Sequence, residues 1–355
     1  MARLDPLFDL LVSRKGSDLH ITAGRPPMVR LRGSLIAARG TDVTQAEVEA
    51  WLLELLDADQ LRRFKAEGDL DFAYAFGDRA RFRASYFNKT TGLGAVFRTI
   101  PSKILSLIDL GCPPVVKTVS QAKKGLVLVT GPTGSGKSTT LAAMLREINE
   151  TRAGHILTIE DPIEFVHAPV KARFTQREVG RHVPDFATAM KSAGREDADV
   201  ILVGELRNAE TMALALRLAS FGVLVFGTVH TNGAPATIDR FVNAFPSDEQ
   251  PMVRGLLSES LIAVISQELI PTADGKGRTA ALEVLLGSSA LSSMIRDGKT
   301  YQITNLMQAG RGQGMQTMDQ ALLELALQGV ITAEDTIARA RDKETVARAL
   351  KERAE

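Results

Sequence analysis

The sequence predicts an α/β protein in two parts, a small α+β region followed by a larger region built on a parallel sheet. The length of 355 residues corresponds to about two domains. After Gly68 the side-chain period drops to two, over 72–76 and again over 80–86, which is typical of antiparallel strands. From Val115 onward, short apolar strands alternate with helical stretches, which indicates a parallel sheet covered by helices on both faces.

The small α+β region is expected to span 1–100. Apolar residues at helical spacing predict a first helix, at Leu4, Leu7, Phe8 and Leu11. Thr44, with Glu47 three residues later, forms a capping box that predicts the start of a second helix. Strands are expected at 18–22, 28–31, 72–76, 80–86 and 94–98.

The segment 101–114 is expected to be a linker. It contains Pro101, Gly111 and the pair Pro113-Pro114, which interrupt the regular spacing of apolar residues typical of strands and helices. The second region is expected to have a core at 115–287 and a helical remainder at 288–355. Core strands are predicted at 126–130, 155–159, 200–203 and 223–229, and core helices at 138–149, 185–194 and 208–220.

Two further helix starts are predicted from polar residues three positions apart, the first of them a capping box. Ser247 with Gln250 predicts a long helix that ends near Gln267. Thr332 with Asp335 predicts the start of one of the last helices.

Composition excludes several classes of protein. Lys and Arg total 43 against 42 Asp and Glu, so a net charge of +1 gives no bulk attraction to nucleic acid or an acidic membrane surface. The single cysteine, Cys112, excludes an intramolecular disulfide and a cysteine-based zinc site, and fits a reducing compartment. The N-terminus lacks a secretory signal pattern, and no apolar run approaches the roughly 20 residues of a membrane span. A cytoplasmic protein is therefore expected.

A phosphate-binding pattern, G-x-x-x-x-G-K-[ST], lies between the first strand and the first helix of the core. Its residues are Gly131, Pro132, Thr133, Gly134, Ser135, Gly136, Lys137 and Ser138, followed by Thr139. Glycines let successive backbone N–H groups surround phosphate oxygens, and the helix N-terminus adds partial positive charge. Lys137 is expected to reach the β- and γ-phosphates of a nucleotide, and Ser138 to bind Mg²⁺.

Acidic side chains follow two other core strands. Glu205 comes after four apolar residues and a glycine, where a carboxylate would support the metal. The segment 160–164 carries three carboxylates, one of which could orient or deprotonate an attacking water. The alternative for 160–164 is a solvated acidic turn.

Each of two basic features has both a functional and a purely structural interpretation. His230 follows a fourth strand, where an imidazole could contact a γ-phosphate or simply support the structure. Arg79, Arg81 and Arg83 share one strand face, with Arg98 on the next strand. That face could clamp a polyphosphate, with a neighbouring subunit's nucleotide as the target, or could be a solvated side of the sheet.

These segments together resemble the secretion ATPases. Four of them resemble the Walker A, Asp box, Walker B and His box motifs, at 131–139, 159–164, 199–207 and 226–231. Within that superfamily the chain resembles the type IV pilus retraction ATPases of twitching motility, through 16–20, 81–83, 94–103 and 314–319. The resemblance extends over nearly the whole chain.

The resemblance implies a PAS-like N-terminal domain, a RecA-like P-loop ATPase domain with a helical C-terminal region, and a homohexameric ring. It assigns Glu164 as the catalytic carboxylate, Glu205 as the Mg²⁺-side carboxylate, and His230 as a sensor of the γ-phosphate. Arg83 and Arg98 become arginine fingers that complete a neighbouring subunit's site. The implied cofactors are ATP and Mg²⁺, and the implied partner is the inner-membrane platform protein of the pilus, with the ring peripheral at its cytoplasmic side. No nucleic acid partner is expected.

Two positions depart from the family pattern. Val223 stands where a second His-box histidine is usual, and Ser292 where the C-terminal motif has its first arginine.

Three other functions are alternatives to a retraction motor. The chain could be an accessory retraction subunit that depends on a paralogous ATPase for force. A pilus-extension or secretion ATPase is disfavoured because it typically carries a four-cysteine zinc element. A nucleic-acid translocase is disfavoured by the low net charge and the absence of a basic-aromatic stripe.

Overall fold

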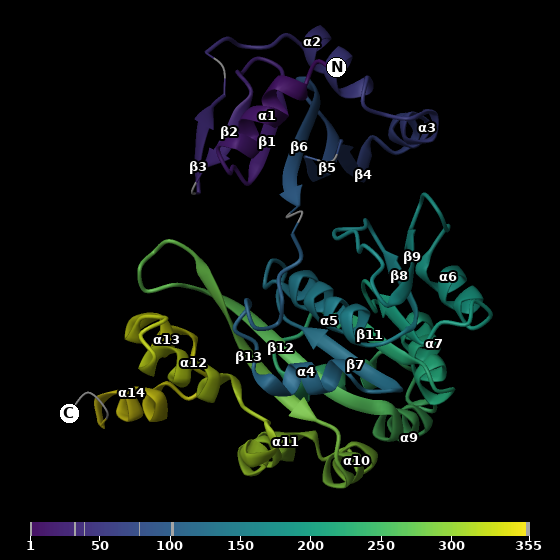
Figure 1. The fold of residues 1–355 in the computed structure, drawn as a ribbon, viewed down its shortest axis with the longest axis vertical. Helices are drawn as coiled ribbons and strands as arrows, with labels where there is room; N and C mark the ends of the chain where they lie inside the picture. Colours follow the sequence, from purple (N-terminus) through teal and green to yellow (C-terminus); the bar gives the residue numbers. More distant parts are fainter. Residues whose placement is uncertain (1, 32, 39, 78, 101–102, 353–355) are drawn as a thin grey trace. The chain divides into compact units, whose positions relative to one another are not determined.

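The chain divides into two compact units (Figure 1). The computed structural model describes residues 2–31, 33–38, 40–77, 79–100 and 103–352. The first unit contains Met1–Lys103 and the short segment Asp161–Val166, and the second contains Ile104–Glu160 and His167–Glu355. Both units are mixed α/β structures.

The first unit is built on a six-stranded antiparallel sheet with the order β3-β2-β1-β6-β5-β4. The strands are β1 (Asp18–Thr22), β2 (Met28–Leu31), β3 (Ser34–Ala37), β4 (Asp69–Phe76), β5 (Ala80–Lys89) and β6 (Gly92–Ile100). The helices are α1 (Asp5–Ser13), α2 (Gln45–Leu53) and α3 (Ala58–Glu67). The capping box of Thr44 and Glu47 is confirmed at the start of α2.

Aromatic side chains form much of the core of the first unit. Phe8 of α1 is fully buried, and its ring centroid lies 4.7 Å from that of Phe82 and 5.0 Å from that of Phe97. Two elements were not expected from the sequence, β3 and α3. All four residues of β3 are exposed, so the strand has no apolar alternation to reveal it.

The second unit is built on a seven-stranded sheet with the order β13-β12-β7-β11-β10-β8-β9. The strands are β7 (Gly125–Thr130), β8 (Gly154–Glu160), β9 (Ala172–Glu178), β10 (Val200–Val203), β11 (Leu224–Val229), β12 (Leu261–Pro271) and β13 (Arg278–Leu286). All neighbouring pairs are parallel except the pair of β12 and β13. The carboxyl ends of β7, β8, β10, β11 and β12 therefore lie along one edge of the sheet.

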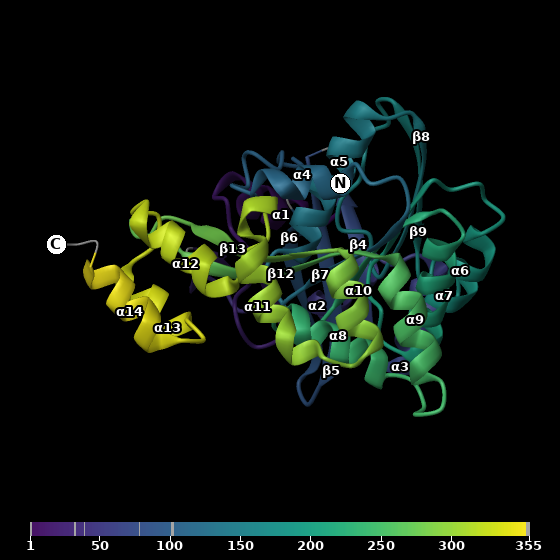
Figure 2. The ribbon, with the colours of Figure 1, turned by 90° about the horizontal axis from the view of Figure 1, so that it is seen from below.

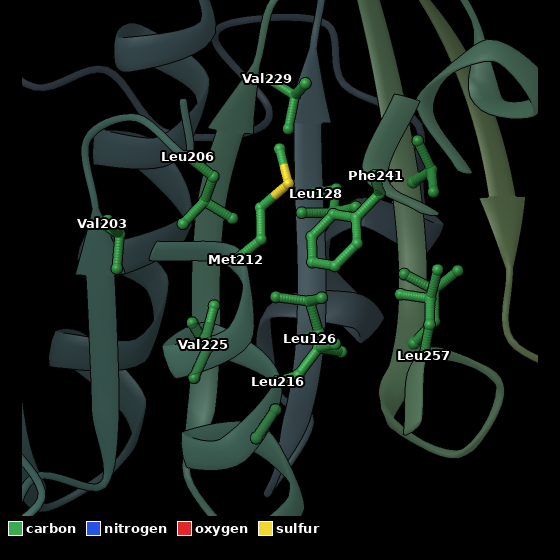
Figure 3. Close-up of a cluster of buried hydrophobic side chains, with 14 of the residues drawn as sticks. Leu126, Leu128, Val203, Leu206, Met212, Leu216, Val225, Val229, Phe241 and Leu257 are labelled. Atoms are coloured by element: carbon green, nitrogen blue, oxygen red, sulfur yellow. The ribbon is translucent and has the colours of Figure 1, made fainter. Parts of the chain in front are cut away.

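Helices cover both faces of this sheet, as expected. The helices of the unit are α4 (Pro114–Ser120), α5 (Lys137–Thr151), α6 (Phe186–Ala193), α7 (Ala209–Ser220), α8 (Ala234–Asn243), α9 (Gln250–Ser260), α10 (Ser289–Arg296), α11 (Ile303–Ala309), α12 (Met318–Leu327), α13 (Ala333–Arg339) and α14 (Lys343–Glu352). On one face, Met212 of α7, Phe241 of α8 and Leu257 of α9 pack against Leu126 and Leu128 of β7 (Figure 3). On the other face, α4 and α5 pack against β7 through a separate cluster of buried side chains.

The C-terminal region is helical, as expected from residue 288 onward. Thr332 accepts a hydrogen bond from the backbone N–H of Asp335 and starts α13, as predicted. Figures 1 and 2 both draw α12 near β13, with α13 and α14 grouped around α12. Among the helices of the described residues, none combines the length and the apolar character needed to cross a membrane.

The expectation of a single helix from Gln250 to Gln267 is wrong. Helix α9 ends at Ser260, and the chain continues as β12 from Leu261. Most side chains between Leu261 and Gln267 are buried because β12 lies between two strands, and such an apolar run does not separate a buried strand from a buried helix. The predicted cap at Ser247 is also wrong, since the N-cap is Glu249 and no side chain caps the helix.

The predicted linker is described only in part. Pro101 and Ser102 lie outside the described residues. From Ile104 the segment packs within the second unit, where Leu107 is buried and the Ile104 carbonyl accepts a 2.8 Å hydrogen bond from Arg146 Nη1. The boundaries 1–100, 101–114, 115–287 and 288–355 remain predictions.

We expect Phe8→Ala to destabilise the first unit by about 3–5 kcal/mol, because it opens a cavity among packed aromatic rings. Trp51 is the only tryptophan and lies against the same core, so its fluorescence during denaturant unfolding reports on this unit. Leu35→Ala, on the exposed β3, is the matched control and should change stability by less than about 0.5 kcal/mol. Equal midpoints for the two variants would contradict the packing described.

Candidate active site

The phosphate loop follows β7 directly and ends where α5 begins at Lys137, as the sequence predicts. Its glycines are required by geometry. Gly131 has a φ of 140°, and a Cβ there would lie 2.3 Å from the carbonyl oxygen of Gln267. Gly136 has a φ of 88°, and a Cβ there would lie 2.8 Å from Gln267 Nε2. The loop therefore approaches β12 too closely for any side chain at either position.

Gln267 of β12 anchors the phosphate loop to the sheet. Its Nε2 donates to the carbonyl oxygen of Ser135 at 2.6 Å, and its Oε1 accepts from the hydroxyl of Thr140 at 2.7 Å. The side chain is buried, so both bonds are shielded from water. The sequence pattern does not reveal Gln267, because it predicts a helix where β12 lies.

The loop residues fit a nucleotide phosphate. Lys137 is buried, and its Nζ donates to the carbonyl oxygens of Gly131 at 2.8 Å and Pro132 at 3.0 Å. The hydroxyl of Ser135 is buried without a hydrogen-bond partner, which is costly for a polar atom unless a ligand supplies one. No side chain caps the start of α5, so the backbone N–H groups of its first turn remain available to an anion.

The metal side of such a site can be formed by Ser138 and Glu205. Ser138 is exposed in the first turn of α5, and Glu205 is half-buried after β10. Among the described residues, no group of three or more His, Cys, Asp or Glu side chains is placed to hold a metal ion. Mg²⁺ in ATPases takes most of its ligands from water and nucleotide phosphates, so these two groups fit its needs.

Glu205 and His230 come together at the carboxyl ends of the neighbouring strands β10 and β11. Glu205 Oε1 lies 3.3 Å from His230 Nε2, and Glu205 Oε2 lies 2.8 Å from Arg207 Nε. Gly204 keeps the strand end close to β8, since a Cβ there would lie 3.2 Å from the carbonyl oxygen of Ile159. Glu205, His230 and the phosphate loop thus share one edge of the sheet.

The acidic segment after β8 is divided between the two units. Glu160 ends β8, and its Oε1 accepts a 2.6 Å hydrogen bond from the hydroxyl of Thr158. Asp161–Val166 belongs to the first unit, and Glu164 is half-buried within it. Glu164 is therefore in a different unit from the phosphate loop, and its expected role as the catalytic carboxylate remains a prediction.

Arg83 and Arg98 lie directly opposite each other on β5 and β6 of the first unit. Like charges in this position repel, and each arginine has an acidic partner that offsets the repulsion. Arg83 Nη2 lies 3.2 Å from Asp71 Oδ2, and Arg98 Nε lies 2.9 Å from Oδ1 of the buried Asp18. Burial raises the pKa of Asp18, but hydrogen bonds from Arg98 and Ser17 outweigh it and hold this pKa below its ordinary value.

The two positions that depart from the resembled family lie away from the phosphate loop. Val223 precedes β11, whereas His230 follows it, so the two residues are at opposite ends of that strand. Ser292 lies on α10, where its hydroxyl donates a 2.6 Å hydrogen bond to the carbonyl oxygen of Ser258 on α9.

Comparison with known proteins gives close relatives over nearly the whole chain. The twitching motility protein of Neisseria gonorrhoeae is 48% identical over 345 residues, which covers 96% of this chain and 92% of that protein. The type IV pilus retraction ATPase PilT of Pseudomonas aeruginosa is 50% identical over 319 residues, covering 90% of this chain and 92% of that protein. The crystal structure of the pilus retraction motor PilT with bound ADP has a TM-score of 0.90 at 40% identity, and the match covers 98% of this chain and 99% of that one.

The family model for the Type II/IV secretion system protein matches residues 11–348, which include the phosphate loop, Glu205 and His230. With nearly the full chain covered and the motif residues gathered at one sheet edge, the chain belongs to the Type II/IV secretion system protein family.

Proposed function

We propose that this chain is an ATPase that hydrolyses ATP to ADP and phosphate and uses the energy to retract a type IV pilus in twitching motility. The observation that carries the proposal is the shared sheet edge, where the phosphate loop, Glu205 and His230 meet. The relatives that match nearly the whole chain are named as a twitching motility protein and a pilus retraction ATPase.

Each residue at the edge has a defined task in this proposal. The ammonium group of Lys137 leaves the carbonyl oxygens of Gly131 and Pro132 and binds the β- and γ-phosphates, so it exchanges one set of oxygen acceptors for another. Ser138 and Glu205 hold the side of the site where Mg²⁺ would neutralise phosphate charge. His230, already paired with Glu205, is placed to contact the γ-phosphate.

Glu164 is proposed to take the proton of the attacking water. That water bonds to the γ-phosphorus, the bond from this phosphorus to the bridging oxygen breaks, and ADP and inorganic phosphate are released. Arg83 and Arg98 are proposed to act on the nucleotide of a neighbouring subunit and to neutralise charge in the transition state. Their acidic partners Asp18 and Asp71 hold the side chains over the sheet until phosphate competes for them.

The finer architecture is part of the same proposal. The first unit is a PAS-like domain, the core of the second unit is RecA-like, and six copies form a ring. The ring lies at the cytoplasmic side of the inner membrane, against the platform protein of the pilus. The mixed α/β fold and the match to the solved retraction motor support this arrangement.

An accessory role, in which a paralogous retraction ATPase supplies force, is the second candidate. The observation that favours it is Ser292, whose short hydroxyl is turned toward α9. An arginine has a planar group with five donors and a permanent charge, so serine cannot reproduce contacts that an arginine would make there with a partner.

Lys137→Ala should abolish ATP binding, whereas Glu205→Gln and Glu164→Gln should retain it and lose turnover by several orders of magnitude, each order being about 1.4 kcal/mol of barrier. Isothermal titration and a phosphate-release assay separate the two effects. Lys276→Ala, in the exposed turn between β12 and β13, is the control. Turnover like that of wild type in Glu164→Gln would disprove its role.

Mixed rings test whether the arginines act on a neighbour. Subunits with Arg83→Ala and subunits with Glu164→Gln should restore activity together, because some interfaces then combine an intact Glu164 with an intact Arg83. Arginine fingers contribute roughly 10³–10⁵ in rate in related phosphoryl transfer, so even partial restoration is measurable. The control mixture, Arg83→Ala with Arg98→Ala, should stay inactive because every interface lacks one arginine. If the first mixture is no more active than the second, the arginines do not act in trans.

Ser292→Arg distinguishes the motor from the accessory subunit. The substitution should change ATPase turnover by less than about tenfold, or ~1.4 kcal/mol, because α10 lies away from the phosphate loop. Under the accessory reading, it should raise the frequency of pilus retraction in cells that lack other retraction ATPases. Ser293→Arg, on the exposed side of α10, is the control. Full retraction by the wild-type chain alone, with no gain from Ser292→Arg, would eliminate the accessory reading.

A further inference from the structure

A fully buried carboxylate, Glu283 of β13, joins the His230 loop to the C-terminal helices. Its exposed fraction is 0%. Glu283 Oε1 accepts a 2.7 Å hydrogen bond from the backbone N–H of Ala234, the first residue of α8. Glu283 Oε2 accepts a 3.2 Å bond from the N–H of Met318, the first residue of α12, and lies 3.1 Å from Nη1 of Arg341. One carboxylate therefore holds the starts of two helices and one guanidinium.

Arg341 also contacts the loop after His230 directly. Gly233 has a φ of 98°, and a Cβ there would lie 2.2 Å from Arg341 Nη2 and 3.0 Å from its Cζ. The guanidinium therefore packs on the backbone of Gly233, in space that any side chain would fill. The N–H of Gly233 donates a 2.9 Å bond to the hydroxyl of Ser266, which is next to Gln267 on β12. The loop from His230 to Gly233 is thus held between Glu205 at one end and Glu283, Arg341 and Ser266 at the other.

The segment that carries Arg341 is itself fixed to α12. The two oxygens of Asp319 accept bonds from the backbone N–H groups of Arg341 at 2.8 Å and Asp342 at 2.9 Å. Asp319 ends the motif 314–319, to which no chemical step has been assigned. The connection between α13 and α14 therefore reaches the edge of the sheet through one arginine.

The energetics make this contact sensitive to movement of the C-terminal helices. Glu283 is fully buried, whereas the Arg341 side chain is 45% exposed, so withdrawing Arg341 leaves a buried charge without its ionic partner. A displacement of α14 that withdraws Arg341 would leave Glu283 with only backbone donors. The start of α8, four residues after His230, would keep the hydrogen bond from Ala234 to Glu283 but lose the guanidinium that packs on Gly233.

We propose that Glu283 and Arg341 are positioning residues for His230, and that through them the presence of a γ-phosphate is coupled to the C-terminal helices. The inference rests on the proposed function of His230 as the γ-phosphate contact. Neither residue touches the nucleotide. Both act by fixing the loop that carries the imidazole.

The test is the preference of the full-length protein for a non-hydrolysable ATP analogue over ADP, measured as the ratio of the two dissociation constants. His230→Ala and Arg341→Ala should each reduce that ratio by about three- to tenfold, the net value of one ordinary hydrogen bond. The double variant should reduce it no further, because both changes remove the same contact. Arg348→Ala, an exposed arginine on α14, is the matched control and should leave the ratio unchanged.

The outcomes separate the inference from the function on which it rests. A reduced ratio in His230→Ala with a normal ratio in Arg341→Ala overturns the positioning role alone, even if the melting temperature falls. Additive effects in the double variant overturn it as well. A normal ratio in His230→Ala overturns the sensor role and the inference with it. If Arg341→Ala does not fold, Glu283→Gln and Arg341→Lys are measured in its place. Glu283→Gln should reduce the ratio of dissociation constants, and Arg341→Lys should keep part of the wild-type ratio.

Discussion

The parallel pairing of the strands in the second unit is the constraint on which the candidate site depends. Because β7, β10 and β11 run in the same direction, the residues that follow them meet at one edge of the sheet. Glu205 and His230 are distant in sequence, yet lie 3.3 Å apart for this reason. The phosphate loop starts on the strand next to β11, so its lysine reaches the same edge.

Much of this edge could be predicted from the sequence, since its strands are short apolar runs that end in a polar motif. The strand Val200–Val203 and the loop before Lys137 lie where they were expected. The role of Gln267 could not be predicted. Its contacts with Ser135 and Thr140 join parts of the chain more than a hundred residues apart, and they depend on the neighbours of β12 rather than on its own pattern. The same holds for Glu283, whose donors come from α8, α12 and the C-terminal segment.

Charged side chains are compensated differently in the two units. On the first sheet, Arg79, Arg83 and Arg98 each lie against an acidic residue, and the partner of Arg98 is the buried Asp18. The alternation of β5 predicts which face carries these arginines, but it does not identify their partners on other strands. In the second unit, Glu283 is fully buried, and its hydrogen-bond and ionic partners come from elements that are far apart in the chain. A charge that is compensated from several elements responds to the movement of any one of them.

A crystal structure of the chain with Mg²⁺ and a non-hydrolysable ATP analogue tests the candidate site most directly. We expect Lys137 Nζ to leave the carbonyl oxygens of Gly131 and Pro132 and to bind the β- and γ-phosphates, with Ser138 and Glu205 on the metal side and the buried Ser135 hydroxyl gaining a partner. A nucleotide bound away from this edge, or a Lys137 that keeps both carbonyl contacts beside the phosphates, would contradict this expectation.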